Sequence, residues 1–157
     1  MKLAGVLMGT LLAAVVVASC GGTDGSDTTS SVTKAEFVKQ ASSICTKTAA
    51  KRDAAALALF KEQRKRGEPS AKELQKRMEE VVSEAVLPAL DHMTDELAEL
   101  DAPTDGQEQV DAMIDAYREA IQEAESELTA VANGDSDPLS QPRKLAIAYG
   151  VKACVQV

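Results

Sequence analysis

Three cysteines are the residues of this chain whose side chains are best suited to chemistry. A thiol can form a disulfide, bind a metal or carry a covalent group, and cysteine spacing helps to decide between these. Cys20 stands in "VVVASCGGTDG", between an apolar run and a polar glycine-rich segment, whereas Cys45 and Cys154 lie far along the chain. The surroundings of Cys20 therefore have to be interpreted first.

Residues 1–19 have the composition of an export signal. Lys2 provides the positive start, "LAGVLMGTLLAAVVVA" provides the apolar stretch, and the small residues Ala18 and Ser19 stand directly before Cys20. About sixteen residues at 1.5 Å each cover about 24 Å, which is short of a bilayer core of about 30 Å. A retained membrane-spanning helix is therefore the weaker interpretation.

The four residues Val17-Ala18-Ser19-Cys20 resemble the lipobox of bacterial lipoproteins. The resemblance implies that a diacylglyceryl group is transferred to the Cys20 thiol, that the chain is cleaved before it, and that acyl chains such as palmitate hold the protein on the outer face of the plasma membrane. Two or more acyl chains anchor a protein stably, whereas one does not. The alternative is a plain secreted protein whose Cys20 lies near the cleavage site by chance.

Residues 20–32 follow as a polar segment, "CGGTDGSDTTSSV", which is expected to be the lipidated N-terminus and a disordered tether. A stretch of Gly, Ser, Thr and Asp buries too little apolar surface to fold. Cleavage would remove Lys2 and leave 16 basic and 25 acidic residues, a net charge of −9.

Residues 33–157 are predicted to form an all-α domain, a small antiparallel bundle of three long helices and a short C-terminal helix. The chain lacks Trp and has only 3% aromatic residues, so Ala, Leu, Val, Ile and Met must form the core, and no segment alternates convincingly as a strand does. "TKAE" at Thr33, "SAKE" at Ser70 and "TDGQ" at Thr104 each have the spacing of a capping box, which marks a helix start.

Apolar residues at spacings of three or four predict the helices themselves. The first helix is expected from about Lys34 to Arg66, with Phe37, Ala41, Ile44, Thr48, Ala55 and Leu59 on one stripe. The second is expected from Ser70 to Leu100, with a kink or a split at Pro88. The third carries a stripe from Val110 to Val131 and is stopped by Asn133-Gly134. The short fourth helix is expected from Pro138 or Ser140 to Tyr149, with Gly150 as its cap.

Cys45 and Cys154 are predicted to form a disulfide. If Cys20 carries lipid, they are the only cysteines left to pair, and export to an oxidising compartment favours a bridge. Chain-entropy models assign about 4–5 kcal/mol to a loop of about 110 residues. The alternative is two buried free thiols.

The sequence shows no pattern typical of an enzyme or of a metal or cofactor site. His92 is the only histidine, G-x-S-x-G is absent, and two Glu-x-x-His units cannot be formed with one histidine. We expect His92 to be a half-buried helix residue. "NGDSDP" begins like a calcium loop but departs from it at Pro138 and Lys144, so a turn is expected. Met78, Met93 and Met113 could bind copper with His92, but methionine at helical spacing is more often core.

The charge is distributed unevenly. Residues 47–77 contain ten Lys or Arg and four acidic residues, whereas residues 78–137 contain eighteen acidic residues and Arg118. A net charge of −8 argues against nucleic-acid binding. The simplest interpretation is an acidic solvated face beside a basic helix. The sharper one is that Lys61, Arg64, Lys65 and Arg66 in "KEQRKRG" contact an anionic polymer or lipid headgroups.

Several segments together resemble a group of small uncharacterised lipoproteins of actinobacteria. They are "KAEFVKQASSIC", "LPAL" followed by "LAELDAP", a Glu-rich helix, "NGDSDP" and "AYGVKAC", which together span most of residues 33–157. The resemblance implies an extracytoplasmic helical domain with a Cys45–Cys154 bridge. It implies no activity.

The sequence thus predicts a non-enzymatic, membrane-anchored lipoprotein whose bundle acts as a binding or interaction module in the cell envelope. One alternative is a carrier of a small apolar ligand held between the helices. Another is a structural protein that contacts the cell wall through Lys61 to Arg66. The sequence leaves the ligand, the partner and the oligomeric state open.

Overall fold

The computed structural model describes residues 32–157, and this part of the chain is helical without any strand. In chain order it contains α1 (Lys34–Lys65), α2 (Ala71–Val81), the π-helical turn η1 (Val82–Val86), α3 (Leu87–Ala98), α4 (Gln107–Ser126), α5 (Leu128–Asn133), α6 (Ser140–Tyr149) and the 3₁₀ helix η2 (Lys152–Gln156). The prediction of an all-α bundle is confirmed. The predicted signal peptide, Cys20 and residues 21–31 of the tether lie outside the described residues.

Two of the three predicted capping boxes start helices. Thr33 and Ser70 accept hydrogen bonds from the backbone amides of Glu36 and Glu73, whose carboxylates accept from the two cap residues in return. These hydrogen bonds from hydroxyl and backbone groups lower the pKa of Glu36 and of Glu73. The two boxes therefore fix where α1 and α2 begin.

The third predicted capping box, at Thr104, is wrong. α4 begins at Gln107, its N-cap is Gly106, and no side chain caps it. The Gly106 amide donates to the carbonyl of Pro103 over 2.8 Å, so Thr104 lies within a turn that precedes the helix. Gln107 bonds Asp111 one turn ahead instead of reaching back.

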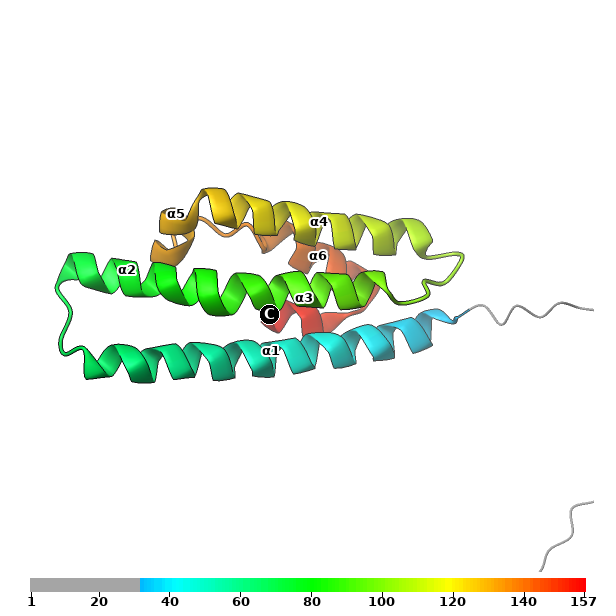
Figure 1. Ribbon diagram of the computed structural model, residues 1–157. Helices are drawn as coiled ribbons and strands as arrows, with labels where there is room; N and C mark the ends of the chain where they lie inside the picture. The colour runs from blue at the N-terminus through cyan, green and yellow to red at the C-terminus, as the bar shows by residue number, and fades with distance from the viewer. Residues whose placement is uncertain (1–31) are drawn as a thin grey trace, which may run out of the picture.

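Pro88 neither splits nor sharply breaks the second predicted helix. α2, η1 and α3 run on as one rod beside α1 (Figure 1). The chain widens to a π-turn immediately before Pro88, where the Leu87 amide donates to the carbonyl of Val82. Proline lacks an amide hydrogen and its ring clashes with the carbonyl four residues earlier, and a wider turn relieves both problems.

The third predicted helix is shorter than its apolar stripe. α4 ends at Ser126, Glu127 departs from helical geometry with φ −115° and ψ 32°, and α5 follows as a separate short helix. The break turns α5 toward α2, where the Thr129 hydroxyl donates to Glu79 over 2.7 Å. The two predicted glycine caps are confirmed, since Gly134 and Gly150 end α5 and α6 at φ 78° and 110°.

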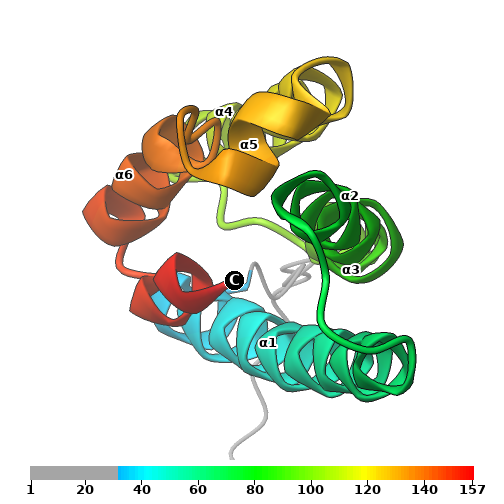
Figure 2. The same cartoon turned by 90° about the vertical axis from the view of Figure 1, so that its left-hand side faces the viewer.

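Four rods surround the core. Seen from one end, α1, the α2–α3 rod, α4 and α6 occupy the corners, and η2 lies against α1 (Figure 2). The inner face of α1 carries Phe37, Ala41, Cys45 and Thr48, as its stripe predicts, but Ala55 is exposed. Beyond Thr48 the buried face continues instead through the half-buried residues Ala56 and Leu59 to Gln63, so the prediction for Ala55 is wrong.

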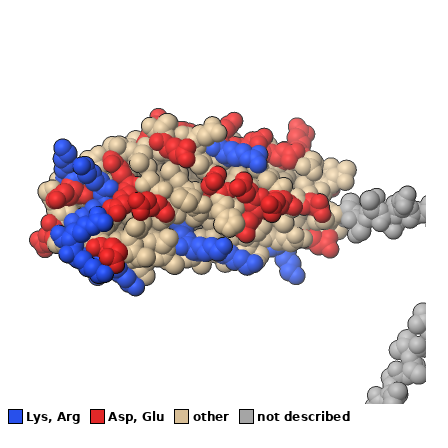
Figure 3. All heavy atoms as spheres, viewed as in Figure 1, with Lys and Arg blue, Asp and Glu red and all other residues tan. Residues whose placement is uncertain are grey.

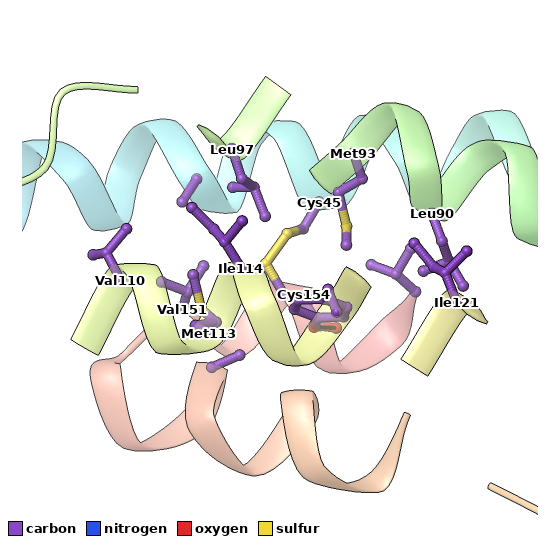
Figure 4. Close-up of a cluster of buried hydrophobic side chains, with 14 of the residues drawn as sticks. Cys45, Leu90, Met93, Leu97, Val110, Met113, Ile114, Ile121, Val151 and Cys154 are labelled. Atoms are coloured by element: carbon purple, nitrogen blue, oxygen red, sulfur yellow. Dashed lines mark hydrogen bonds between the residues drawn. A yellow bond between two sulfur atoms is a disulfide. The ribbon is translucent and has the colours of Figure 1, made fainter. Parts of the chain in front are cut away.

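The predicted disulfide is present at the centre of the core. Cys45 of α1 and Cys154 of η2 are fully buried and bridged, with their Cα atoms 4.9 Å apart. The bridge lies among Met93, Ile114 and other apolar side chains of α3 and α4 (Figure 4). Tyr117 of α4 donates from its hydroxyl to the Cys154 carbonyl over 3.0 Å. The C-terminal segment is thus held from two sides.

Among residues 32–157, no helix is both long enough and apolar enough to cross a membrane.

Candidate functional site

The turn between α1 and α2 is held by paired side-chain contacts. The Gln63 amide donates to the Arg77 carbonyl over 3.0 Å, and the Arg77 guanidinium donates to the Gln63 carbonyl over 3.0 Å. Arg77 also donates to the carbonyl of Gly67, which adopts a positive φ of 84° in the turn. Gln63 is buried, and these contacts satisfy its side-chain amide and its main-chain carbonyl. These contacts therefore hold the turn between α1 and α2 in one conformation.

The four predicted contact residues all lie on this end and are exposed. We call Lys61, Arg64, Lys65 and Arg66 the basic tip. Lys65 pairs with Glu62 at 2.7 Å, and Arg66 approaches Glu80 at 3.4 Å. Within residues 32–157, Lys61 and Arg64 pair with no carboxylate. Exposed ion pairs contribute at most about 1 kcal/mol, so all four cations remain accessible to an anion.

Two exposed apolar side chains adjoin the basic tip. Leu57 and Phe60 are 54% and 40% exposed, and each stands four residues before a cation, Lys61 and Arg64 respectively. Residues four apart are neighbours on a helix surface. The outer face of α1 therefore offers apolar and cationic groups side by side.

Lys and Arg are most concentrated at the end where α1 joins α2, where some acidic side chains lie among them (Figure 3). Along the rest of the visible face, Asp and Glu outnumber the scattered basic side chains (Figure 3). The described chain begins at the opposite end, where α1 starts (Figure 1). α1 has 32 residues and hence a length of about 48 Å, which separates the two ends.

A second candidate site is a partly open apolar slot of 290 Å³ along the other side of the bundle. Val82 and Val86 of η1, Leu90 of α3, and Ala120 and Ala124 of α4 line it. The turn between α5 and α6 closes its remaining side. The π-turn before Pro88 therefore forms part of its wall.

Arg143 of α6 lines the same slot. Among residues 32–157, its Nε is the only buried nitrogen of a cationic side chain that has no hydrogen-bond partner. Its Nη1 donates to both carboxylate oxygens of Asp137, at 3.0 and 3.1 Å, and its Nη2 donates to the main-chain oxygen of Val157 at 3.3 Å. Its Nε is buried and has no hydrogen-bond partner. A buried donor without a partner costs about 1–3 kcal/mol.

A third candidate site is a hollow of 470 Å³ at the end of the bundle where α1 begins. Lys34 stands 4.4 Å above the ring of Tyr149, and the Tyr149 hydroxyl is buried beneath Gly106 without a hydrogen-bond partner. Burial raises the pKa of Tyr149, and the nearby Asp105 carboxylate raises it further. Any side chain at position 106 would meet this hydroxyl, which accounts for the glycine.

His92 differs from its prediction. Its side chain is 59% exposed, and its Nε2 lies 4.0 Å from Glu96. The next two residues, Met93 and Thr94, take the buried positions of this turn, so His92 points to solvent. Met93 and Met113 are fully buried core residues and Met78 is half-buried. In residues 32–157, no group of three or more His, Cys, Asp or Glu side chains is arranged to hold a metal ion.

Sequence reasoning found the basic tip and the disulfide but missed the slot and Arg143. A run of cations is visible in the sequence itself, whereas the slot combines residues of three segments, 82–90, 120–124 and 131–143, that come together only in the fold. The one available signal was "NGDSDP" followed by Arg143, and it indicated only a turn.

The chain matches no known protein-family model, and comparisons with curated proteins and with solved structures find no similar protein.

Proposed function

We propose that this protein is a lipid-anchored, non-catalytic interaction module of the cell envelope that contacts anionic wall polymer through its basic tip. The observation that carries the proposal is the position of the tip. Its four exposed cations lie at the far end of α1, about 48 Å from the end at which the described chain begins. A protein held by its N-terminus would present them away from the membrane.

The chemistry of the tip suits a polymer of repeated negative charges. Lys61 and Arg64 are free of intramolecular pairs within the described residues, so binding an anion breaks no existing contact. Arginine binds phosphate through several N–H groups, and lysine provides a compact charge. Exposed charges act within about 10 Å at ordinary salt, so the contact is expected to be salt-dependent.

The anchor itself is tested by Cys20→Ser. A serine hydroxyl cannot take the thioether-linked diacylglyceryl group, so we expect the full chain to move from the membrane fraction to the soluble fraction. Cell fractionation and immunoblotting measure this change, with Ser43→Ala, at an exposed position of α1, as a control that keeps both the anchor and the disulfide. Protein that remains in the membrane fraction with its signal cleaved would contradict lipid attachment at Cys20.

The wall contact is tested by Lys61→Gln with Arg64→Gln in the full chain, extracted from membranes in mild detergent. Loss of two exposed cations is expected to weaken co-sedimentation with purified cell wall roughly tenfold, at up to about 1 kcal/mol for each contact. The remaining binding should depend less on salt.

The matched control is Lys47→Gln with Lys51→Gln, which removes the same charge from exposed positions in the middle of α1. This variant should bind cell wall like the unchanged protein. Equal binding by all three proteins would refute the wall contact. Loss of binding to phosphatidylglycerol vesicles but not to cell wall would assign the tip to a membrane surface instead.

A further inference from the structure

The aromatic side chain beside the basic tip is an exception in this protein. The chain contains two Phe, two Tyr and no Trp. Three of these four aromatic residues are buried at 5% exposure or less, whereas Phe60 is 40% exposed. Single exposed apolar residues are common, but exposed aromatic residues beside arginine are typical of binding surfaces. The exposure of Phe60 therefore directs attention to its neighbours.

Large exposed apolar side chains gather at the end of the bundle that carries the basic tip. Among residues 32–157 they are Leu57, Phe60, Leu74 and Ile147. The first three lie within residues 57–74, in the last turns of α1 and the first turn of α2. Only Ile147, on α6, lies elsewhere. This end of the bundle is thus both its most basic and its most exposed apolar part.

Leu57, Phe60, Lys61 and Arg64 form one continuous patch on α1, which we call the amphipathic patch. All four side chains are exposed. Their spacing of three and four residues makes Leu57 a neighbour of Phe60 and Lys61, and makes Arg64 a neighbour of the same two residues. Apolar and cationic groups therefore alternate over the patch, about 5–6 Å apart.

The two cations of the patch are those that lack an ion pair. Lys65 and Arg66, the other members of the basic tip, lie outside the patch and each has a carboxylate partner. Within residues 32–157, no carboxylate pairs with Lys61 or Arg64. An anion bound at the patch therefore replaces only water at these two cations, and it lies directly beside the two apolar side chains.

The charge of α1 argues against a second copy of the chain as the occupant. α1 contains eight Lys or Arg and three Asp or Glu, so two copies that paired through this helix would repel each other. A membrane surface would suit the chemistry of the patch, but the proposed anchor holds the opposite end of α1, about 48 Å away. A polymer with charges alone would leave Leu57 and Phe60 in water. The occupant that satisfies both halves of the patch is anionic and partly apolar.

We propose that the anionic wall polymer bound by the basic tip carries an apolar substituent, such as an alkyl or acyl group, close to its negative charges. Lys61 and Arg64 bind the anionic group, and the substituent covers Leu57 and Phe60. The spacing of the patch requires the charge and the substituent to lie within about 10 Å of each other in the polymer. This inference rests on the proposed wall contact and specifies which polymer the tip selects.

Small probes test the chemistry of the patch. The full chain carrying Cys20→Ser, which needs no detergent that would cover the patch, is titrated with hexyl phosphate and with methyl phosphate by ligand-observed NMR. The two probes have the same anionic group, and only the first can remove apolar surface from water. We expect hexyl phosphate to bind at least about tenfold more tightly, and uncharged hexanol to bind more weakly than hexyl phosphate. Equal binding of the two phosphates would overturn the proposal.

Replacing the apolar half of the patch locates the binding. Leu57→Ser with Phe60→Ser keeps both cations, so it should reduce the binding of hexyl phosphate to the level of methyl phosphate. The matched control is Ile147→Ser, which removes an exposed apolar side chain of α6 and should leave both probes unchanged. Circular dichroism confirms that each variant is folded. Unchanged binding of hexyl phosphate by the double serine variant would refute the patch as its site.

Co-sedimentation with purified cell wall at high salt separates this inference from the proposed wall contact. At about 1 M salt, exposed charges act over only about 3 Å, whereas apolar contact persists. The Cys20→Ser chain should therefore keep part of its binding at high salt, and Leu57→Ser with Phe60→Ser should lose this part but still bind at low salt. If the double serine variant binds like its parent at every salt concentration while Lys61→Gln with Arg64→Gln weakens binding, the wall contact stands and the apolar substituent is wrong. If neither double variant weakens binding, both proposals fail.

Discussion

Replacing Cys45 and Cys154 together with alanine is expected to lower the free energy of unfolding by about 4–5 kcal/mol. The bridge spans a sequence separation of 109 residues, and cross-links that close such long loops restrict the unfolded chain most. Single domains are stabilised by about 5–15 kcal/mol in total, so the loss is a large share. Urea unfolding followed by circular dichroism, on the full chain carrying Cys20→Ser, measures it.

Reduction of the unsubstituted protein is the matched control for this prediction. A reductant removes the bridge without changing a side chain, and it should lower the free energy of unfolding by a similar amount. The double alanine variant should be insensitive to the same reductant. If the double variant is as stable as the oxidised protein, the bridge does not stabilise the bundle and the prediction is wrong.

Tyr117→Ala is expected to cost about 3–5 kcal/mol, the usual range for truncating a large buried aromatic residue. Tyr117 is 1% exposed and has the largest of the fully buried side chains. It packs in the cluster that contains Cys45 and Cys154, and its hydroxyl reaches the Cys154 carbonyl. Removal of the ring leaves a cavity at the junction of α4 and η2. Urea unfolding again provides the measurement.

Tyr117→Phe distinguishes the stability contributed by the packed ring from that contributed by the hydrogen bond of the hydroxyl. This variant keeps the packing and loses only the bond to the Cys154 carbonyl, so it should cost about 1 kcal/mol. A cost as large as that of Tyr117→Ala would show that the hydrogen bond, and not the packing, dominates.

The stability of the unsubstituted protein and that of the Tyr117→Phe variant are expected to depend differently on pH. Burial raises the pKa of Tyr117 from 10.0 to about 12, so the neutral phenol is favoured in the folded state. This contribution is fully present below pH 10 and is lost as the pH rises toward 12. The Tyr117→Phe variant should lack this part of the fall in stability.

The helices could be predicted closely because their signals are local. The hydroxyls of Thr33 and Ser70 and the glycines 134 and 150 act within one turn of the chain, and each marks a helix end in the structure. At Thr104 the same spacing failed, because Pro103 and Gly106 form a turn that takes precedence over the capping box. The pattern alone could not show this competition.

The failures on α1 and α4 have a shared cause. Apolar spacing reports which residues avoid water, but it does not report where the neighbouring helices end. Ala55 has the spacing of a core residue but is exposed, and Leu128 continues the stripe of α4 across a break at Glu127. The slot could not be predicted for the same reason, because Arg143 and the residues of η1 line one cavity only through the packing of the helices between them.

The uninterrupted course of α1 has a mechanical consequence. Its 32 residues link the end where the described chain begins directly to the basic tip. If the N-terminus is fixed in a membrane and the tip is held by wall polymer, tension between them passes along one helix, and the other helices carry none of it. Cys45 lies on this line, so a pull that frays α1 from its beginning would reach the covalent bridge after about three turns. The disulfide would keep Cys45 joined to η2, but the part of α1 between Cys45 and the basic tip would still carry the load.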